Sequence, residues 1–195
     1  MTSNPEDGYQ PSNVTNARGR AVVITGCSGG GKSALLAELA RRGHRVFPEA
    51  GRQIVKEQDW IGGDVLPWSA PAKFAELVLS RGLHQRITAA DAGGLAFFDR
   101  SVVEPLAALE RLALPVPSHF RRAAEVCRYH ETVFVAPPWP EIYRADAERR
   151  HGFEEALAEY GPLTAAYARL GYRLVELPKT TVAARAAFVL QTLGA

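Results

Sequence analysis

Short apolar runs alternate with longer amphipathic stretches along most of this 195-residue chain. Five runs rich in β-branched and aromatic residues predict buried strands, at residues 21–25, 44–48, 94–98, 132–136 and 172–177. The stretches between them repeat their apolar residues at helical spacing. Parallel strands need helical, right-handed crossovers, which cover both faces of the sheet. The pattern therefore predicts a three-layer, doubly wound α/β fold around a five-stranded parallel sheet.

A glycine-rich turn separates the first predicted strand from the first predicted helix. Residues 26–33 read GCSGGGKS and fit the pattern G-x-x-x-x-G-K-[ST], in the strand-turn-helix context that this motif requires. Glycine lets the backbone wrap closely around an anion, and the start of the helix adds a positive field. The turn therefore predicts a phosphate-binding loop for ATP or GTP. The residues expected to bind the nucleotide are Gly26, Ser28, Gly29, Gly30, Gly31, Lys32, Ser33 and Ala34.

Two of these residues have specific expected roles. Lys32 is predicted to contact the β- and γ-phosphates and so to act in catalysis, and the Ser33 hydroxyl is predicted to ligate Mg²⁺.

The third predicted strand is followed by Asp99-Arg100-Ser101. An acidic residue at a strand end beside a phosphate loop can hold Mg²⁺ through water and orient the attacking group. An adjacent arginine can bind an acceptor phosphate or carboxylate through two hydrogen bonds. Asp99 is therefore a candidate metal and catalytic residue, and Arg100 a candidate acceptor ligand. The alternative is that Asp99 or Ser101 caps a helix starting near Val103, with Glu104 in its first turn.

The second predicted strand is followed by Glu49, with Arg52 three residues later. In a kinase, a carboxylate at this edge could accept a hydrogen bond or a proton from the acceptor hydroxyl. Glu49 is thus a candidate catalytic and acceptor-binding residue, or else a first-turn acid that stabilises the next helix dipole. Arg52 could bind the acceptor or pair with Glu49.

A loop at residues 62–64 lies between Trp60 and Trp68. We expect this loop to be mobile and to cover the acceptor site. For both tryptophans, ordinary packing is the preferred interpretation, because large aromatic residues are mostly buried.

The fourth predicted strand runs into the sequence PPWP at residues 137–140, which ends the strand and stiffens the turn. A polar helix is expected to follow, running to about Tyr160, so that residues 138–160 form a lid. Lid arginines can stabilise the charge of phosphoryl transfer, and Arg149 is preferred over Arg144 and Arg150. Because Arg149 and Arg150 differ by about 100° around the helix, one is expected to face phosphate and the other to pair structurally. The alternative is a solvated charged helix stabilised by ion pairs.

Composition narrows the classes of function. The net charge of +2 gives no strong case for a nucleic-acid partner. No apolar run approaches the length of a membrane span, and the first residues lack the apolar core of a signal peptide. Cys27 and Cys127 show no disulfide or metal-binding pattern. We expect a cytoplasmic monomer or homodimer with a disordered tail over residues 1–19 and a nucleotide-binding domain over residues 20–195.

Together, the phosphate loop, Phe98-Asp99-Arg100, Pro137-Pro138-Trp139 and residues 146–150 resemble predicted AAA-type ATPases of the small P-loop kinase branch. These are related to the nicotinamide-riboside kinase domain of bifunctional NAD-biosynthesis regulators, and more distantly to thymidylate and nucleoside kinases. The resemblance covers residues 21–193. It implies a P-loop NTPase fold with strand order 2-3-1-4-5, Mg²⁺-dependent ATP or GTP binding and a helical lid bearing arginines. It also implies that Asp99 lies near Mg²⁺ and the acceptor, and that Glu49 contacts the acceptor. The chain lacks the length and helical subdomain of ring-forming AAA+ motors, so ring assembly is not implied.

Three functions fit these residues to different degrees. The first is a small-molecule kinase in which Lys32, Mg²⁺ and Arg149 stabilise charge, with Asp99 preferred to Glu49 as proton acceptor. The acceptor would be nucleoside-like, polyhydroxylated or anionic. The second is a nucleotide-dependent switch or slow NTPase that regulates a protein partner. A nucleic-acid-linked ATPase fits least, given the near-neutral charge. The sequence contains no base-reading Asn-Lys-x-Asp motif, which favours ATP over GTP.

Overall fold

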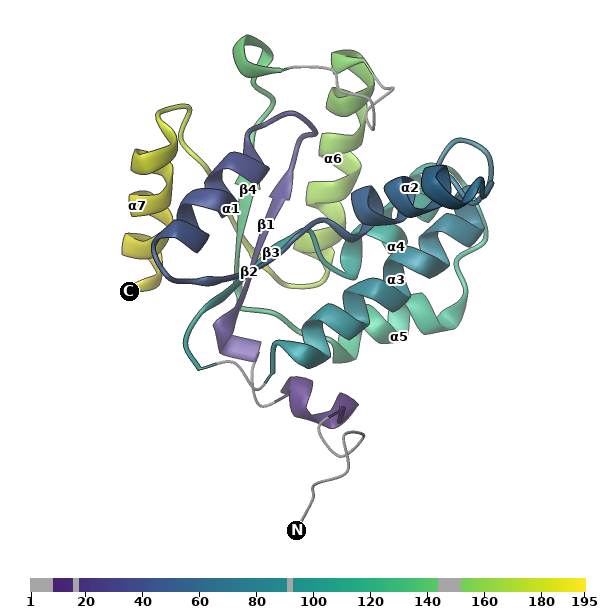
Figure 1. The fold of residues 1–195 in the computed structure, drawn as a ribbon, viewed down its shortest axis with the longest axis horizontal. Helices are drawn as coiled ribbons and strands as arrows, with labels where there is room; N and C mark the ends of the chain where they lie inside the picture. Colours follow the sequence, from purple (N-terminus) through teal and green to yellow (C-terminus); the bar gives the residue numbers. More distant parts are fainter. Residues whose placement is uncertain (1–8, 16–17, 91–92, 144–151) are drawn as a thin grey trace.

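The computed structural model describes residues 9–15, 18–90, 93–143 and 152–195. Its sheet contains five parallel strands: β1 (Ala21–Gly26), β2 (Arg45–Phe47), β3 (Ala96–Asp99), β4 (Thr132–Ala136) and β5 (Arg173–Glu176). They pair in the order β2-β3-β1-β4-β5. This confirms the predicted α/β class and strand order (Figure 1). Each observed strand coincides with a predicted run to within two residues at either end.

Helices cover both faces of the sheet, which explains why the strands are apolar on both sides. On one face, α1 (Lys32–Arg41) and α7 (Val182–Leu193) pack side by side over a core that includes Val22, Ile24 and Phe134 (Figure 1). The other face is covered by α3 (Pro71–Thr88), α4 (Val103–Arg111), α5 (Ser118–Val126) and α6 (Phe153–Arg169). Helix α2 (Ala50–Ile61) packs against α3. The result is the predicted three-layer arrangement.

Helix α6 is longer at its C-terminal end than the sequence predicts. We expect a polar helix ending near Tyr160, but α6 continues through Pro162 to Arg169. Proline removes one helical hydrogen bond. The apolar face continues beyond it, however, and Ala166 and Tyr167 are buried in the core, so tertiary packing extends the helix.

The described residues from Tyr9 to Thr15 differ from the disordered tail expected over residues 1–19, of which residues 1–8 and 16–17 lie outside the described part. The described residues of this region contain two short 3₁₀ helices, η2 (Pro11–Thr15) and η3 (Arg18–Arg20). Val14 is buried, and its carbonyl oxygen accepts a hydrogen bond from Nη2 of Arg86 at 2.9 Å. The ring of Tyr9 stacks on His84 with centroids 5.6 Å apart. Contacts with the C-terminal half of α3 therefore order residues 9–15. Across the described ranges, no helix is both long enough and apolar enough to cross a bilayer.

Candidate active site

The turn between β1 and α1 has the backbone geometry of an anion-binding loop. Gly26, Gly29 and Gly31 have φ angles of 106°, 78° and 76°, in the region that favours glycine. A Cβ atom at Gly26 would lie 2.3 Å from the carbonyl oxygen of Ala136 on β4. The same oxygen accepts a hydrogen bond of 2.9 Å from the N–H of Cys27. The loop is therefore fixed against β4 by a contact that only glycine permits.

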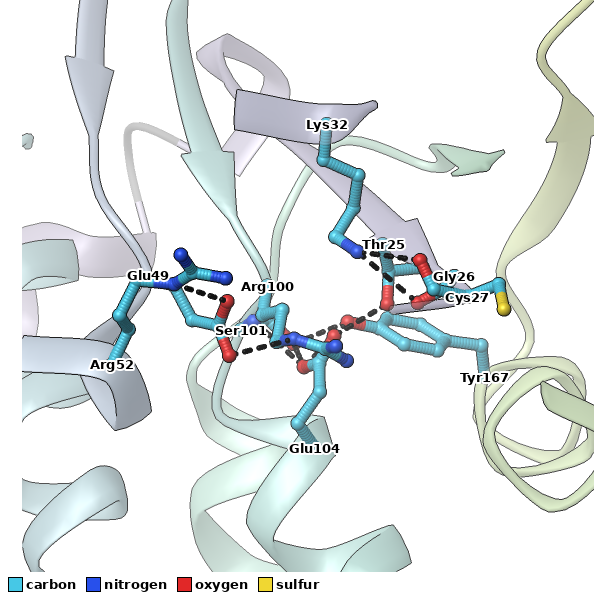
Figure 2. Close-up of polar contacts among 10 residues, drawn as sticks. All are labelled: Thr25, Gly26, Cys27, Lys32, Glu49, Arg52, Arg100, Ser101, Glu104 and Tyr167. Carbon is cyan, nitrogen blue, oxygen red and sulfur yellow. Dashed lines mark hydrogen bonds and ion pairs between the residues drawn. The ribbon is translucent and has the colours of Figure 1, made fainter. Parts of the chain in front are cut away.

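Lys32 is the first residue of α1, and its side chain turns back into the loop (Figure 2). Its Nζ donates to the carbonyl oxygens of Gly26 at 3.3 Å and Cys27 at 2.9 Å. Burial and, to a lesser degree, the charge of Arg100 lower the pKa of Lys32 to about 8, against the opposing effect of the nearby carboxylates. The ammonium group is thus held beside the backbone that is predicted to bind phosphate. Ser33 follows in the first turn of α1, with an exposed side chain.

Asp99 is the last residue of β3, in register with Ile24 of β1. It is 6% exposed, and its Oδ1 atom has no hydrogen-bond partner among the described residues. Burial raises the pKa of Asp99 to about 6, with the Lys32 ammonium opposing the shift. A buried, unpaired carboxylate oxygen needs a hydrogen-bond donor or a cation. Together with the accessible hydroxyl of Ser33, it fits the oxygen ligands that Mg²⁺ and its bound water prefer.

Arg100 joins the ends of two neighbouring strands. Its N–H donates to the carbonyl oxygen of Ile24 at 3.1 Å, and its φ of 72° is left-handed, which is rare for a side-chain-bearing residue. Its Nε donates to Oε1 of Glu49 at 3.1 Å, and Nε of Arg52 lies 3.9 Å from the other Glu49 oxygen (Figure 2). Although burial opposes the charge on Arg100, Glu49 and other carboxylates raise its pKa above the ordinary value. The three predicted acceptor-binding residues therefore form one charged cluster.

Glu104 forms a hydrogen-bond network behind this cluster that the sequence analysis did not predict. The N–H of Ser101 donates to Oε2 of Glu104 at 2.7 Å, and the N–H of Val103 donates to Oγ of Ser101 at 3.0 Å. Oγ1 of Thr25 donates to Oε1 of Glu104 at 2.5 Å, and Tyr167 donates to Oε2 at 2.9 Å (Figure 2). The capping alternative therefore holds for Ser101. The S-x-x-E spacing indicates the cap, but only the fold reveals the contacts with β1 and α6.

A cavity of about 520 Å³ opens beside the cluster, within the usual size range of small-molecule sites. Its polar lining includes Ser28, Glu49, Asp99 and Arg100. Its apolar walls come from α2, the loop before α3, α3, α4 and α6, and include Val55, Trp68, Pro71 and Phe74. The cavity thus meets the phosphate loop at its polar end.

The two tryptophans differ in their positions. Trp68 lines the cavity and is 38% exposed, whereas Trp60 is 86% exposed near the end of α2. The preferred interpretation of ordinary packing is therefore wrong for Trp60, because α2 turns that position toward solvent.

The predicted lid arginines Arg144, Arg149 and Arg150 lie outside the described residues. On either side of them, the ring of Tyr143 contacts that of Phe153 edge-on, with centroids 5.3 Å apart. The Sγ of Cys27 in the phosphate loop also lies 3.6 Å from the carbonyl oxygen of Ala156. The first turn of α6 therefore adjoins the phosphate loop.

Comparisons with known proteins give one family and several similar folds. A family model described as an AAA domain matches residues 21–185. Deoxyadenosine kinase from M. mycoides, with the products dCMP and a flexible dCDP bound, has a TM-score of 0.66 and 16% identity, covering 89% of this chain and 98% of that one. The NadR protein in complex with NR has a TM-score of 0.61 and 18% identity, covering 93% of this chain and 52% of that one. Comparison with curated proteins gave no match. At identities this low, the structural similarity shows a shared fold alone.

Proposed function

The chain belongs to the AAA domain family, and from this premise we propose that it transfers the γ-phosphate of ATP to a small molecule. The observation that carries the proposal is the cavity of about 520 Å³ that meets the phosphate loop at Ser28 and is also lined by Asp99, Arg100 and Glu49. A kinase needs such an acceptor site, because phosphoryl transfer depends on holding the attacking hydroxyl in line with the phosphate. A switch or slow NTPase has no need of one.

The phosphate loop would hold the β- and γ-phosphates through its N–H groups, with Lys32 as the principal cation. The Lys32 ammonium now donates to two loop carbonyls, and phosphate oxygens are stronger acceptors for it. Ser33 and Asp99 are the residues that would hold Mg²⁺. When bound, this ion neutralises charge on the phosphate oxygens. The Ser33 hydroxyl is accessible, and one Asp99 oxygen has no hydrogen-bond partner in the part of the chain that the structure describes.

Glu49 is the better candidate to accept the acceptor's proton, which reverses the order expected from the sequence. Asp99 would be committed to the metal and its water. Glu49 lines the cavity, and Arg100 and Arg52 fix its orientation. Pairing with arginine makes a carboxylate less basic. A loose transition state, however, places more demand on positioning than on base strength.

Arg149 would complete the site by approaching the transferred phosphate from the lid, with Arg144 and Arg150 as alternatives. The supports are the general chemistry of lid arginines and the position of the first turn of α6 against the phosphate loop.

A nucleoside-like acceptor fits the cavity best. Trp68 and Phe74 offer aromatic surface for a flat ring, while Glu49 and Arg100 offer polar partners for a hydroxyl group. The compared structures carry deoxynucleotides in one protein and NR in another, and this supports the same substrate class here.

The test is turnover of ATP and GTP with Mg²⁺, alone and with a panel of acceptors. The panel comprises nucleosides, nicotinamide riboside, nucleoside monophosphates and sugars, with Lys32→Ala as the blank. Turnover that rises many-fold with one class of compound would support the kinase and identify its acceptor. Slow hydrolysis that no compound accelerates would overturn the proposal and favour the nucleotide-dependent switch.

A further inference from the structure

Arg185 reaches the phosphate loop from the side opposite the acceptor cavity. It lies in the first turn of α7, which packs beside α1 (Figure 1). Its Nη2 donates to the carbonyl oxygen of Gly30 at 3.0 Å. A Cβ atom on Gly31 would lie only 2.7 Å from Nη1 of Arg185. The guanidinium group is therefore in direct contact with the backbone just before Lys32.

Among the described residues, this arginine is buried without a countercharge. It is 1% exposed, and in the described part of the chain no carboxylate forms an ion pair with it. Its Nε is buried and has no hydrogen-bond partner there, while its guanidinium lies 5.7 Å from the centre of the Trp139 ring. Buried charges are normally paired, because an isolated one loses its hydration without compensation. An anion bound close to the phosphate loop would therefore balance the charge of Arg185.

The contact with Gly30 also controls a neighbouring donor. The carbonyl of Gly30 and the N–H of Gly31 belong to the same planar trans peptide, so they point in opposite directions. Holding the carbonyl toward Arg185 directs the Gly31 N–H to the other side of the peptide. Successive N–H groups oriented in this way form the anion-binding concavity of a phosphate loop.

We propose that Arg185 is a positioning residue of the nucleotide site: it orients the Gly30–Gly31 peptide, and the phosphates of a bound nucleotide balance its buried charge. This inference rests on the proposed nucleotide binding. It assigns to α7 a role in phosphate binding, in addition to the loop, the strand ends and the lid that the sequence predicts for the site.

Arg86 provides a matched control, because it is a second fully buried arginine with a nitrogen that has no hydrogen-bond partner among the described residues. It lies in the last turn of α3, where its Nη2 donates to the carbonyl oxygens of Val14 and Arg128. These contacts fasten the N-terminal segment, so its role is structural.

The experiment compares Arg185→Met, Arg185→Lys and Arg86→Met with the wild-type chain. Calorimetry would measure the affinities for ADP, ATP and inorganic tripolyphosphate, and thermal unfolding would measure the Tm of each unliganded protein. We expect Arg185→Met to bind all three ligands at least tenfold more weakly, with an unliganded Tm equal to or above that of the wild type. Arg185→Lys keeps the charge and should recover part of the affinity. Arg86→Met should lower the Tm and leave the affinities within about twofold.

Two results would overturn the inference. One is wild-type affinity for ADP and tripolyphosphate in Arg185→Met. The other is that Arg185→Met and Arg185→Lys lose affinity equally, and that both also have a lower Tm than the wild type. This result would indicate that Arg185 has only a structural role. If the wild type itself binds neither ADP nor ATP, the proposed function fails and the inference fails with it.

Discussion

The Nε atom of Arg100 lies 3.1 Å from Oε1 of Glu49, although the two residues are 51 positions apart in the chain. Glu49 follows β2 and Arg100 follows β3, and these strands are neighbours in the sheet. The ion pair lies at the carboxyl edge, where ligands bind in doubly wound folds. Since each side chain fixes the other, the pair should act as a unit at the polar end of the cavity.

Replacing Glu49 by glutamine should reduce phosphate transfer to the acceptor by a factor of about 10²–10⁴, the range for loss of a positioned base. ATP affinity should change little, because the phosphate loop is intact. Steady-state kinetics with the best acceptor, together with ATP calorimetry, would separate the two effects. Glu57→Gln is the control, since Glu57 pairs with Arg81 at 2.9 Å on the surface of α2. If Glu49→Gln kept most of the transfer, Asp99 would become the proton acceptor.

Trp68→Ala should raise the KM for a flat-ring acceptor about tenfold or more and leave ATP affinity unchanged. Trp68 lines the cavity, and loss of its aromatic surface removes stacking and apolar contact. Trp60→Ala should leave both constants unchanged, because its side chain is 86% exposed. Equal effects of the two substitutions would contradict the assigned position of the acceptor.

Glu104→Ala should lower the free energy of unfolding by about 3 kcal/mol, because it leaves several buried donors without an acceptor. These donors belong to Thr25, Ser101 and Tyr167. Denaturant unfolding would measure the loss. Glu110→Ala, which breaks surface pairs with Arg121 and Arg169, should cost about 1 kcal/mol in all. Similar losses in the two variants would show that the network adds no stability beyond that of a surface pair.

The pKa of Lys32 predicts a pH dependence of stability for the protein without metal or nucleotide. Its folded value is about 8, against 10.5 for an ordinary lysine. Between these values the unfolded chain binds more protons, so unfolding becomes harder as pH rises. Relative to Lys32→Met, the wild type should therefore gain stability from about pH 8 upward, by roughly 2–3 kcal/mol in total. If the free energies of unfolding of the two proteins changed with pH in the same way, burial would not lower the pKa of Lys32.

Much of the fold and part of the site were predictable because their signals are local. A run such as residues 21–25 identifies a strand by its own composition, and the GCSGGGKS turn identifies a phosphate loop by its spacing. Asp99 and Arg100 could be placed at the site because parallel strands end at a common edge. Their exact partners required the sheet order, which came from the resemblance and not from spacing.

The remaining features depend on contacts between distant parts of the chain. Glu104 accepts a hydrogen bond from Tyr167, which lies 63 positions away in the chain. No local sequence pattern predicts that bond. Likewise, Pro162 indicates a helix end locally, but burial of Ala166 and Tyr167 overrides it. The polar residues before Thr15 are typical of a disordered tail. Val14 is nevertheless buried, and its carbonyl oxygen accepts a hydrogen bond from Arg86.

The contact between Val14 and Arg86 has a practical consequence for work on the purified protein. Helix α3 is one continuous helix of 18 residues, a stiff rod about 27 Å long. Its first turn carries Phe74 into the acceptor cavity, and its last turn holds the N-terminal segment. Trimming the chain at Thr15 to aid crystallisation would release one end of the rod whose other end shapes the cavity. Acceptor affinities measured on the trimmed and the untrimmed chain are therefore not interchangeable.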